Sequence, residues 1–173
     1  MHPLLQKLAG VDRRSIGKSN EAVAEILADP NLFGVLFNGM LSDDPVLRMR
    51  CADTVERISA QHPEYLRPYK KKLLQQVAGI EQQEVRWHAA QLFSRVALSA
   101  KERLAVVDIL AEYLKDESKI VKTFSMQALA DIAAQDETLR APIIKQLEKL
   151  TRTGSPAMKA RGKKLLAKLK GGS

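Results

Sequence analysis

The sequence predicts an all-α fold, an α-solenoid of about five stacked antiparallel helix pairs. Three observations support this fold class. Apolar residues recur with helical spacing, similar segments recur at intervals close to 37 residues, and no stretch alternates apolar and polar residues as a strand would. A helix pair with two apolar faces buries both only by stacking on neighbouring pairs. We therefore expect one repeat domain over residues 1–170 of the 173-residue chain.

Four segments share one pattern: an apolar residue, a basic residue, a small residue at offset 4, and apolar residues at offsets 8 and 11. They are "LRMRCADTVERI" from Leu47, "VRWHAAQLFSRV" from Val85, "VKTFSMQALADI" from Val121 and "MKARGKKLLAKL" from Met158. Their starts are separated by 38, 36 and 37 residues, and a weaker copy, "IGKSNEAVAEIL", starts at Ile16. The apolar offsets form one stripe on an α-helix. Each copy is therefore predicted to be one amphipathic helix.

The small residue at offset 4 predicts a close helix crossing. This position holds Cys51, Ala89, Ser125 and Gly162 in the four good copies. Small side chains allow another helix to approach closely there. Cys51 occupies one of these core positions, so we expect its thiol to be buried and inert.

Several helix starts are marked by capping residues. Asp44 and Ser155 each precede a proline, which is typical of an N-cap followed by proline at the first helical position. Ser118 can cap the third copy, whereas Gln82 is a poor cap for the second.

A second set of apolar stripes lies between these helices, over residues 31–41, 65–78, 101–115 and 139–151. Pro63, Pro68 and Pro142 should lie in first turns or at kinks, because proline lacks a backbone N–H. Gly79 is expected to end the helix over 65–78. Pairing the two sets predicts repeats over residues 1–28, 31–60, 63–98, 101–134 and 138–170. The final "GGS", residues 171–173, is interpreted as a linker or tag remnant.

The repeated segments resemble HEAT and armadillo-like repeats. "DDPVLRMRCADTVERI", "QQEVRWHAAQLFSRV" and "SKIVKTFSMQALADI" are similar to the second helix of HEAT units. The resemblance implies a right-handed superhelical stack whose second helices line a concave face. It does not define a function, because such repeats serve many roles.

Composition is that of an ordinary globular chain, with 45% hydrophobic and 28% charged residues. No apolar run approaches the ~18 residues that cross a bilayer, and the N-terminus lacks the features of a signal peptide. The single cysteine allows no intramolecular disulfide. These features favour a cytoplasmic protein without membrane contact.

The net charge of +8 is unevenly placed. Residues 138–173 hold ten basic residues and one acidic residue, Glu148, so this segment alone carries +9. A basic end can attract nucleic acid or another polyanion, although a solvated, lysine-rich capping repeat is the favoured interpretation.

The outward positions of the second helices form the candidate binding surface, at offsets 2, 3 and 6. The candidate partner-binding residues there are Arg50, Asp53, Trp87, His88, Gln91, Thr123, Arg161 and Lys164. Trp87 is predicted near the middle of the exposed concave face as an anchor for a partner, flanked by Met49 and Thr123. Alternatively, it leans over Met49 or Phe124 and fills a gap between repeats.

The other polar residues of "EVRWHAA" have structural interpretations. Arg86 shares offset 1 with Arg48, Lys122 and Lys159, and a basic residue there is typical of HEAT-like units, where it braces the turn between paired helices. His88 has no Cys, His or Asp cluster at ligand spacing, so a hydrogen-bonded histidine at the helix edge is favoured over a metal ligand or catalytic base.

No catalytic motif is present, so we expect no enzyme activity, cofactor, metal or small-molecule substrate. Resemblance suggests one enzyme class as an alternative. HEAT-like alkylpurine DNA glycosylases use basic residues, tryptophans and an aspartate on a concave face, and Trp87, Asp53, Arg50, His88 and Arg161 could mimic that set. The match is poor, because there is one tryptophan and Asp53 lies on a different repeat.

The favoured hypothesis is a non-catalytic scaffold that binds a protein or peptide on its concave face. The alternative is a nucleic-acid binder that uses the basic C-terminal repeat together with Arg50, Arg86 and Lys122. An engineered array is disfavoured by the irregular repeats. A subunit of a larger assembly would be indicated by an exposed apolar edge on the N-terminal helices, at Leu4, Leu5 and Leu8.

Overall fold

All regular secondary structure in the described part of the chain is helical, as the sequence predicts. The computed structural model describes residues 1–10 and 17–171, and these contain no strand. Ile16, where the weak copy starts, and the last two residues of "GGS" lie outside the described residues. Within the described residues, no helix is long and apolar enough to cross a membrane.

The chain folds into two compact units, residues 1–96 and 97–173. Their boundary lies at the junction between two predicted repeats, 63–98 and 101–134. The first unit contains α1 (Pro3–Gln6), α2 (Ser19–Ala28), α3 (Phe33–Gly39), α4 (Pro45–Gln61), α5 (Lys70–Gln75), α6 (Gln83–Phe93) and the 3₁₀ helices η1 (Pro30–Leu32), η2 (Pro63–Tyr69) and η3 (Val77–Gly79). The second unit contains α7 (Ala100–Tyr113), α8 (Lys119–Gln135), α9 (Glu137–Thr153) and α10 (Pro156–Lys170).

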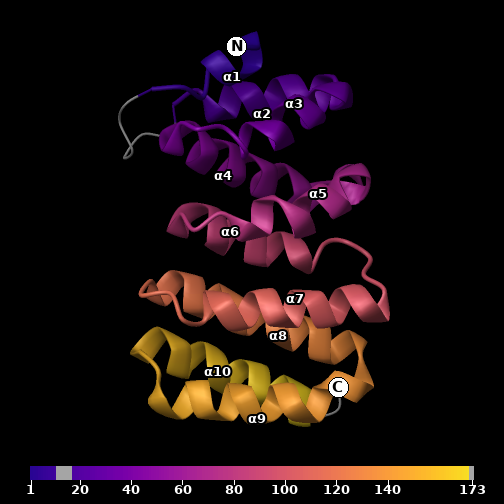
Figure 1. The fold of residues 1–173 in the computed structure, drawn as a ribbon, viewed down its shortest axis with the longest axis vertical. Coiled ribbons are helices and arrows are strands. Elements are labelled where there is room, and N and C mark those ends of the chain that lie inside the picture. The colour runs from indigo at the N-terminus through magenta and orange to yellow at the C-terminus, as the bar shows by residue number, and fades with distance from the viewer. Residues whose placement is uncertain (11–16, 172–173) are drawn as a thin grey trace. The chain divides into compact units, whose positions relative to one another are not determined.

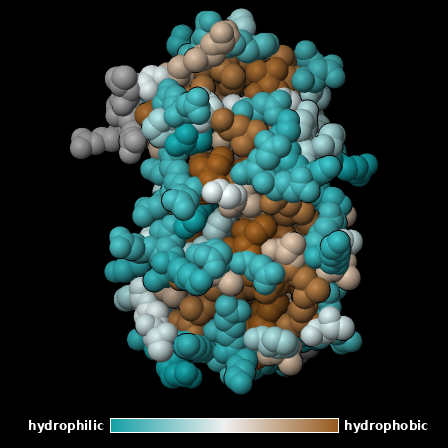
Figure 2. All heavy atoms as spheres, in the orientation of Figure 1, coloured by the Kyte–Doolittle hydropathy of each residue, from teal (hydrophilic) through white to brown (hydrophobic). Residues whose placement is uncertain are grey.

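The four copies of the sequence pattern coincide with α4, α6, α8 and α10. In the first unit α4 packs against α2, α3 and α6, and in the second unit α8, α9 and α10 pack on one another while α7 packs on α8 (Figure 1). The side chains at the repeated apolar offsets fill these contacts, and hydrophobic residues of each unit show between hydrophilic ones on the face in Figure 2. Helices that carry the same pattern therefore pack side by side within each unit.

Helix starts follow the predicted caps. The Asp44 carboxylate accepts a hydrogen bond from the Val46 N–H at 2.9 Å, and Ser118 and Ser155 accept from the N–H groups of Val121 and Met158 at 3.2 and 3.3 Å. Gln82 makes no side-chain capping bond, as expected from its residue type. These contacts confirm the predicted starts of α4, α8 and α10.

The close crossing predicted at the small residues is confirmed at two of the four positions. A Cβ atom built at Gly39 of α3 would overlap the Sγ of Cys51, and one built at Gly162 would overlap the side chain of Thr151 in α9. Cys51 is fully buried, and burial raises the pKa of its thiol to about 12. The predicted burial is confirmed, and the thiol stays protonated at neutral pH.

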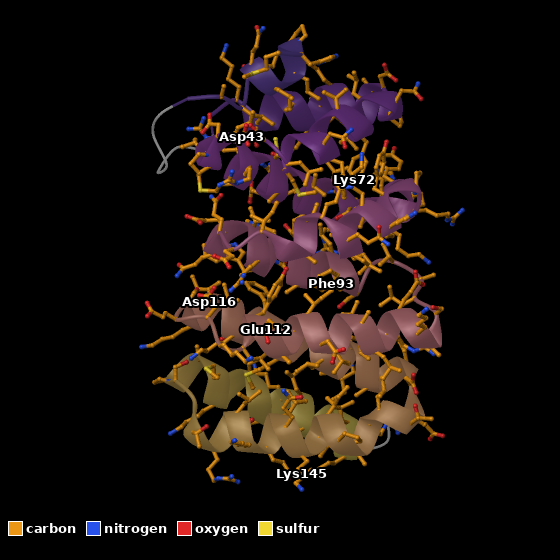
Figure 3. The ribbon with its side chains drawn as sticks, viewed as in Figure 1. Asp43, Lys72, Phe93, Glu112, Asp116 and Lys145 are labelled. Atoms are coloured by element: carbon orange, nitrogen blue, oxygen red, sulfur yellow. The ribbon has the colours of Figure 1, made fainter. Side chains whose placement is uncertain are left out.

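The helix predicted over residues 65–78 is broken into three pieces. The chain forms η2, then the short α5, then η3, which ends at Gly79. Pro63 begins η2 and Pro68 lies inside it, so two N–H groups are missing from this stretch. Aromatic packing stabilises the irregular path, because the ring centroids of Tyr65 and Tyr69 lie 5.6 and 5.9 Å from the ring centroid of Phe33. On α5, the Lys72 ammonium (Figure 3) donates to the Asn38 side-chain oxygen at 2.7 Å.

The other first helices form where the sequence predicts them, and one proline does not behave as expected. The segments predicted at 31–41, 101–115 and 139–151 correspond to α3, α7 and α9. Pro142 lies inside α9, so the prediction that it avoids a helix interior is wrong. The helix starts two residues earlier than expected, because Asp136 caps it through the Thr138 N–H at 3.0 Å. The earlier start leaves Pro142 in the helix interior.

Candidate partner-binding faces

The second helices of the first unit, α4 and α6, are joined at their N-terminal ends. Arg48 donates from Nε to the Gln82 side-chain oxygen at 2.9 Å, and the Gln82 amide donates back to the Pro45 carbonyl at 2.8 Å. The Arg48 guanidinium also donates to the carbonyls of Ser42 and Asp43 at 2.8 and 3.2 Å. At Arg48, these bonds confirm the bracing of the inter-helix turn expected for the basic residue of the repeat.

A second set of bonds joins the C-terminal ends of α4 and α6. Arg95, two residues after α6, donates to the backbone carbonyl and carboxylate of Glu56 at 2.7 and 2.8 Å, and to the Ser59 hydroxyl at 3.0 Å. Sequence reasoning missed Arg95. It stands at offset 10, and Arg57 at the same offset of α4 donates to the Asn20 side chain of α2 at 2.7 Å. The recurrence of a charged residue at offset 10 could therefore have identified the positions that join neighbouring helices.

Asp53 and His88 join the middle of the two helices. His88 is 8% exposed, its Nδ1 lies 2.6 Å from the Glu84 carbonyl oxygen, and its Nε2 lies 3.5 Å from a carboxylate oxygen of Asp53. The predicted hydrogen-bonded histidine is confirmed, and both ring nitrogens face protein acceptors. His88 is therefore part of the packing between α4 and α6, and its predicted place on the edge of the exposed face is wrong.

Trp87 and Gln91 remain partly exposed on α6. Trp87 is half-buried, with its ring centroid 5.7 Å from that of His88, and Gln91 donates from its side chain to the Trp87 carbonyl at 3.1 Å. Asp53 on α4 is half-buried as well. These three residues form the accessible part of the predicted face in the first unit.

Arg50 does not belong to an exposed face. It is 4% exposed, and its guanidinium donates to the carbonyls of Leu8 and Ala9 at 2.8 and 3.0 Å. Gly10 and Gly17 both have positive φ, and a Cβ at either position would press on this guanidinium. The prediction of an accessible Arg50 is wrong, because the side chain holds the chain segment after α1 against α4.

In the second unit, α8 and α10 are joined by the same type of contact. Arg161 donates to the side-chain oxygen of Gln127 at 3.1 Å, and the Gln127 amide donates to the Asp131 carboxylate at 3.1 Å. The Arg161 guanidinium lies 6.0 Å from the centre of the Phe124 ring. Thr123, half-buried, uses its hydroxyl for the Lys119 carbonyl at 2.8 Å. Lys164 is exposed on α10.

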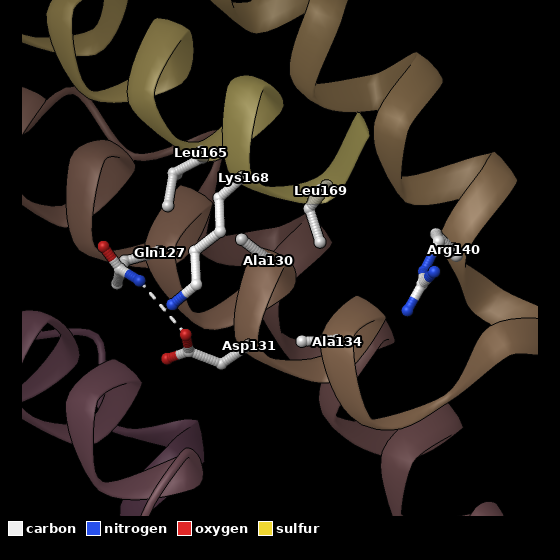
Figure 4. Close-up of a pocket in the computed structure, with 8 residues that line it drawn as sticks. All are labelled: Gln127, Ala130, Asp131, Ala134, Arg140, Leu165, Lys168 and Leu169. Atoms are coloured by element: carbon white, nitrogen blue, oxygen red, sulfur yellow. Dashed lines mark hydrogen bonds between the residues drawn. The ribbon is translucent and has the colours of Figure 1, made fainter. Parts of the chain in front are cut away.

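A pocket of about 280 Å³ opens beside this row of polar side chains (Figure 4). Its lining residues are Gln127, Ala130, Asp131, Ala134, Arg140, Leu165, Lys168 and Leu169. The floor is apolar, and Arg140 of α9 points into the pocket from the side opposite Lys168, whose ammonium lies beside the Gln127–Asp131 pair. An apolar floor with a few polar groups around it is the usual form of a binding pocket.

Sequence reasoning did not find this pocket. None of its lining residues was among the predicted binding residues, although Asp131 and Lys168 occupy offset 10, as Arg57 and Arg95 do. The pocket lies where three helices of the unit meet, and a pattern taken from one helix at a time does not show which side chains converge there. Among the described residues, no group of three or more His, Cys, Asp and Glu side chains could hold a metal ion.

Comparison with known proteins does not assign the chain to a family. No protein-family model matches it, and no curated protein matches it significantly. The geometry of the two faces is therefore the basis for inferring a function.

Proposed function

We propose that this chain is a non-catalytic, cytoplasmic scaffold built of HEAT-like repeats, and that it binds a protein or peptide on the exposed face of its second helices. Side-by-side packing of α4 with α6 and of α8 with α10 supports the repeat class. The α8–α9–α10 pocket carries the binding function, because it provides an apolar floor for an anchoring side chain with polar groups around it.

The exposed face of the first unit supports the same function. Trp87 is half-buried, and a partly exposed indole supplies a large rigid contact area at low entropic cost. Gln91 and Asp53 flank it with hydrogen-bonding groups. Each unit thus has a place for a partner, and the two can be tested separately.

Site-directed photo-cross-linking tests the pocket in the second unit. A photoreactive phenylalanine replaces Ala134, which is exposed and lines the pocket, and a matched variant carries it at Ala105, which is exposed on α7. In the native cell, we expect a partner to be covalently captured from position 134 and not from position 105. No capture at 134, or equal capture at both positions, would show that the pocket is not a binding site.

Binding measurements with the captured partner then test each face. Trp87→Ala and Arg140→Gln should each raise the dissociation constant about tenfold, which corresponds to about 1.4 kcal/mol of binding free energy. Lys101→Gln, an exposed change on α7, is the matched control and should leave the affinity unchanged. An unchanged affinity for Trp87→Ala would remove the α4–α6 face from the proposal.

A further inference from the structure

Helices α9 and α10 of the second unit carry an unbalanced positive charge. From Thr138 to the C-terminus, Glu148 is the only acidic residue in the sequence, and its carboxylate lies 2.5 Å from the Lys170 ammonium. The segment has no second acidic residue to balance the charge of its other nine basic residues. Their net field attracts anions.

Part of this charge lies on one side of α9. Lys145, Lys149 and Arg152 are exposed, and their spacing of four and three residues places them on one helix face. They line a shallow hollow of about 440 Å³ with Pro142, Gln146 and Glu148. The helical rise of about 1.5 Å per residue separates the three basic residues by about 6 and 4.5 Å along the axis. Figure 3 shows Lys145 projecting away from the body of its unit.

The fold keeps this side of α9 open. Ile143 and Leu147 are the buried residues of the helix, and they face α8 and α10. The basic residues are exposed, and their helical spacing from Ile143 and Leu147 places them on the opposite side. The α8–α9–α10 pocket uses Arg140, which is not part of this basic row, so the two surfaces are chemically distinct.

The chemistry of this surface restricts the kind of polyanion. Residues 138–173 contain no aromatic residue, so the surface has no platform on which unpaired bases could stack. The large exposed hydrophobic residues of the described chain, namely Met1, Leu27, Leu104 and Ile120, lie on neither α9 nor α10, so the surface has no apolar group to insert into a bilayer. Duplex nucleic acid needs neither an aromatic platform nor an apolar group, because its bases are already stacked and its phosphate backbone is what a basic surface contacts.

We propose that the Lys145–Lys149–Arg152 row of α9 binds the phosphate backbone of duplex nucleic acid without reading its sequence. This inference is independent of the proposed scaffold function. It also differs from a surface that includes Arg50, because that guanidinium is buried and bonded to the backbone.

Salt-dependent binding of a fluorescein-labelled 20-base-pair duplex DNA of mixed sequence tests the proposal. Three phosphate contacts predict a fall in log affinity of about 2.7 per unit of log salt, since each contact contributes about 0.9. The triple variant Lys145→Gln/Lys149→Gln/Arg152→Gln should bind at least about tenfold more weakly at ~50 mM salt, with a slope near zero. Circular dichroism should show that this variant keeps its helix content.

A second triple variant is the matched control. Lys159→Gln/Lys163→Gln/Lys164→Gln removes the same charge from exposed positions of α10 and should change the affinity less than threefold. Equal losses of affinity in the two triple variants would show that DNA binding depends on the net charge and not on its position, and would overturn the role of α9. No duplex binding at low salt, or binding to phosphatidylserine vesicles and not to duplex, would overturn the proposal altogether.

Discussion

Gly162→Ala measures how closely α9 and α10 approach. In the variant, Cβ and Cγ2 of Thr151 would lie 2.8 and 3.0 Å from the new methyl carbon, and Oγ1 would lie closer still. The Thr151 hydroxyl cannot rotate away freely, because it donates to the Leu147 carbonyl at 2.6 Å. Overpacking of this kind costs about 1–3 kcal/mol, whereas alanine gains about 1 kcal/mol over glycine inside a helix. With three atoms in conflict, we take the upper end and expect a net loss of about 2 kcal/mol.

Thermal and chemical denaturation followed by circular dichroism give the measurement. For a chain of this size, Tm should fall by about 2–4 °C for each kcal/mol lost. Gly79→Ala is the control, because a Cβ there meets no atom within 4 Å and the variant should be neutral or slightly stabilised. Thr151→Ala should relieve part of the conflict, because it removes Oγ1 and Cγ2 and leaves only Cβ, so the double variant should lose less than the sum of the single losses. A Gly162→Ala protein as stable as the wild type would refute the close crossing.

Three further predictions concern single groups. Arg95→Met should lower the free energy of unfolding by about 2 kcal/mol in urea denaturation, because three charge-assisted hydrogen bonds between neighbouring helices are lost, and a change within error would contradict this. Cys51 should resist iodoacetamide at pH 8 in the folded protein and react after unfolding, because burial raises its pKa to about 12, and fast labelling of the native chain would argue against burial. Hydrogen bonds from Thr138 and Arg103 hold the pKa of Asp136 below its usual 3.8, so its carboxylate stabilises the fold above that pH and the contribution is lost as the pH falls through the lower folded value. Asp136→Asn keeps the cap and should flatten this acid dependence of the unfolding free energy, and an unchanged dependence would assign it to other carboxylates.

The helices were predictable where the signal lies within one helix. The caps at Asp44, Ser118 and Ser155 satisfy N–H groups a few residues away, so sequence alone shows them. The broken segment over 65–78 was not predictable in the same way. Its apolar spacing fits a continuous helix, and its path depends on Pro68 together with aromatic contacts to Phe33, a residue more than thirty positions earlier.

The candidate site was predictable only in part, for a related reason. A helical wheel separates a buried stripe from an outward face, but it does not show which intermediate positions meet a neighbouring helix. Trp87 and Gln91 at offsets 2 and 6 stay partly exposed, in line with the wheel. Arg50 and His88 at offset 3 are buried, because Arg50 meets the chain segment after α1 and His88 meets Asp53 of α4.

One contact register recurs in both units and explains this result. His88 at offset 3 of α6 lies beside Asp53 at offset 6 of α4, and Arg161 at offset 3 of α10 donates to Gln127 at offset 6 of α8. The chemical pairs differ, an imidazole with a carboxylate in one unit and a guanidinium with an amide in the other, yet the offsets are the same. The shared register therefore follows from how successive second helices pack, and offset 3 belongs to the junction between them. Trp87 at offset 2 and Arg140 in the pocket belong to neither of these pairs, so they separate binding from stability better than Arg50, His88 or Arg161 would.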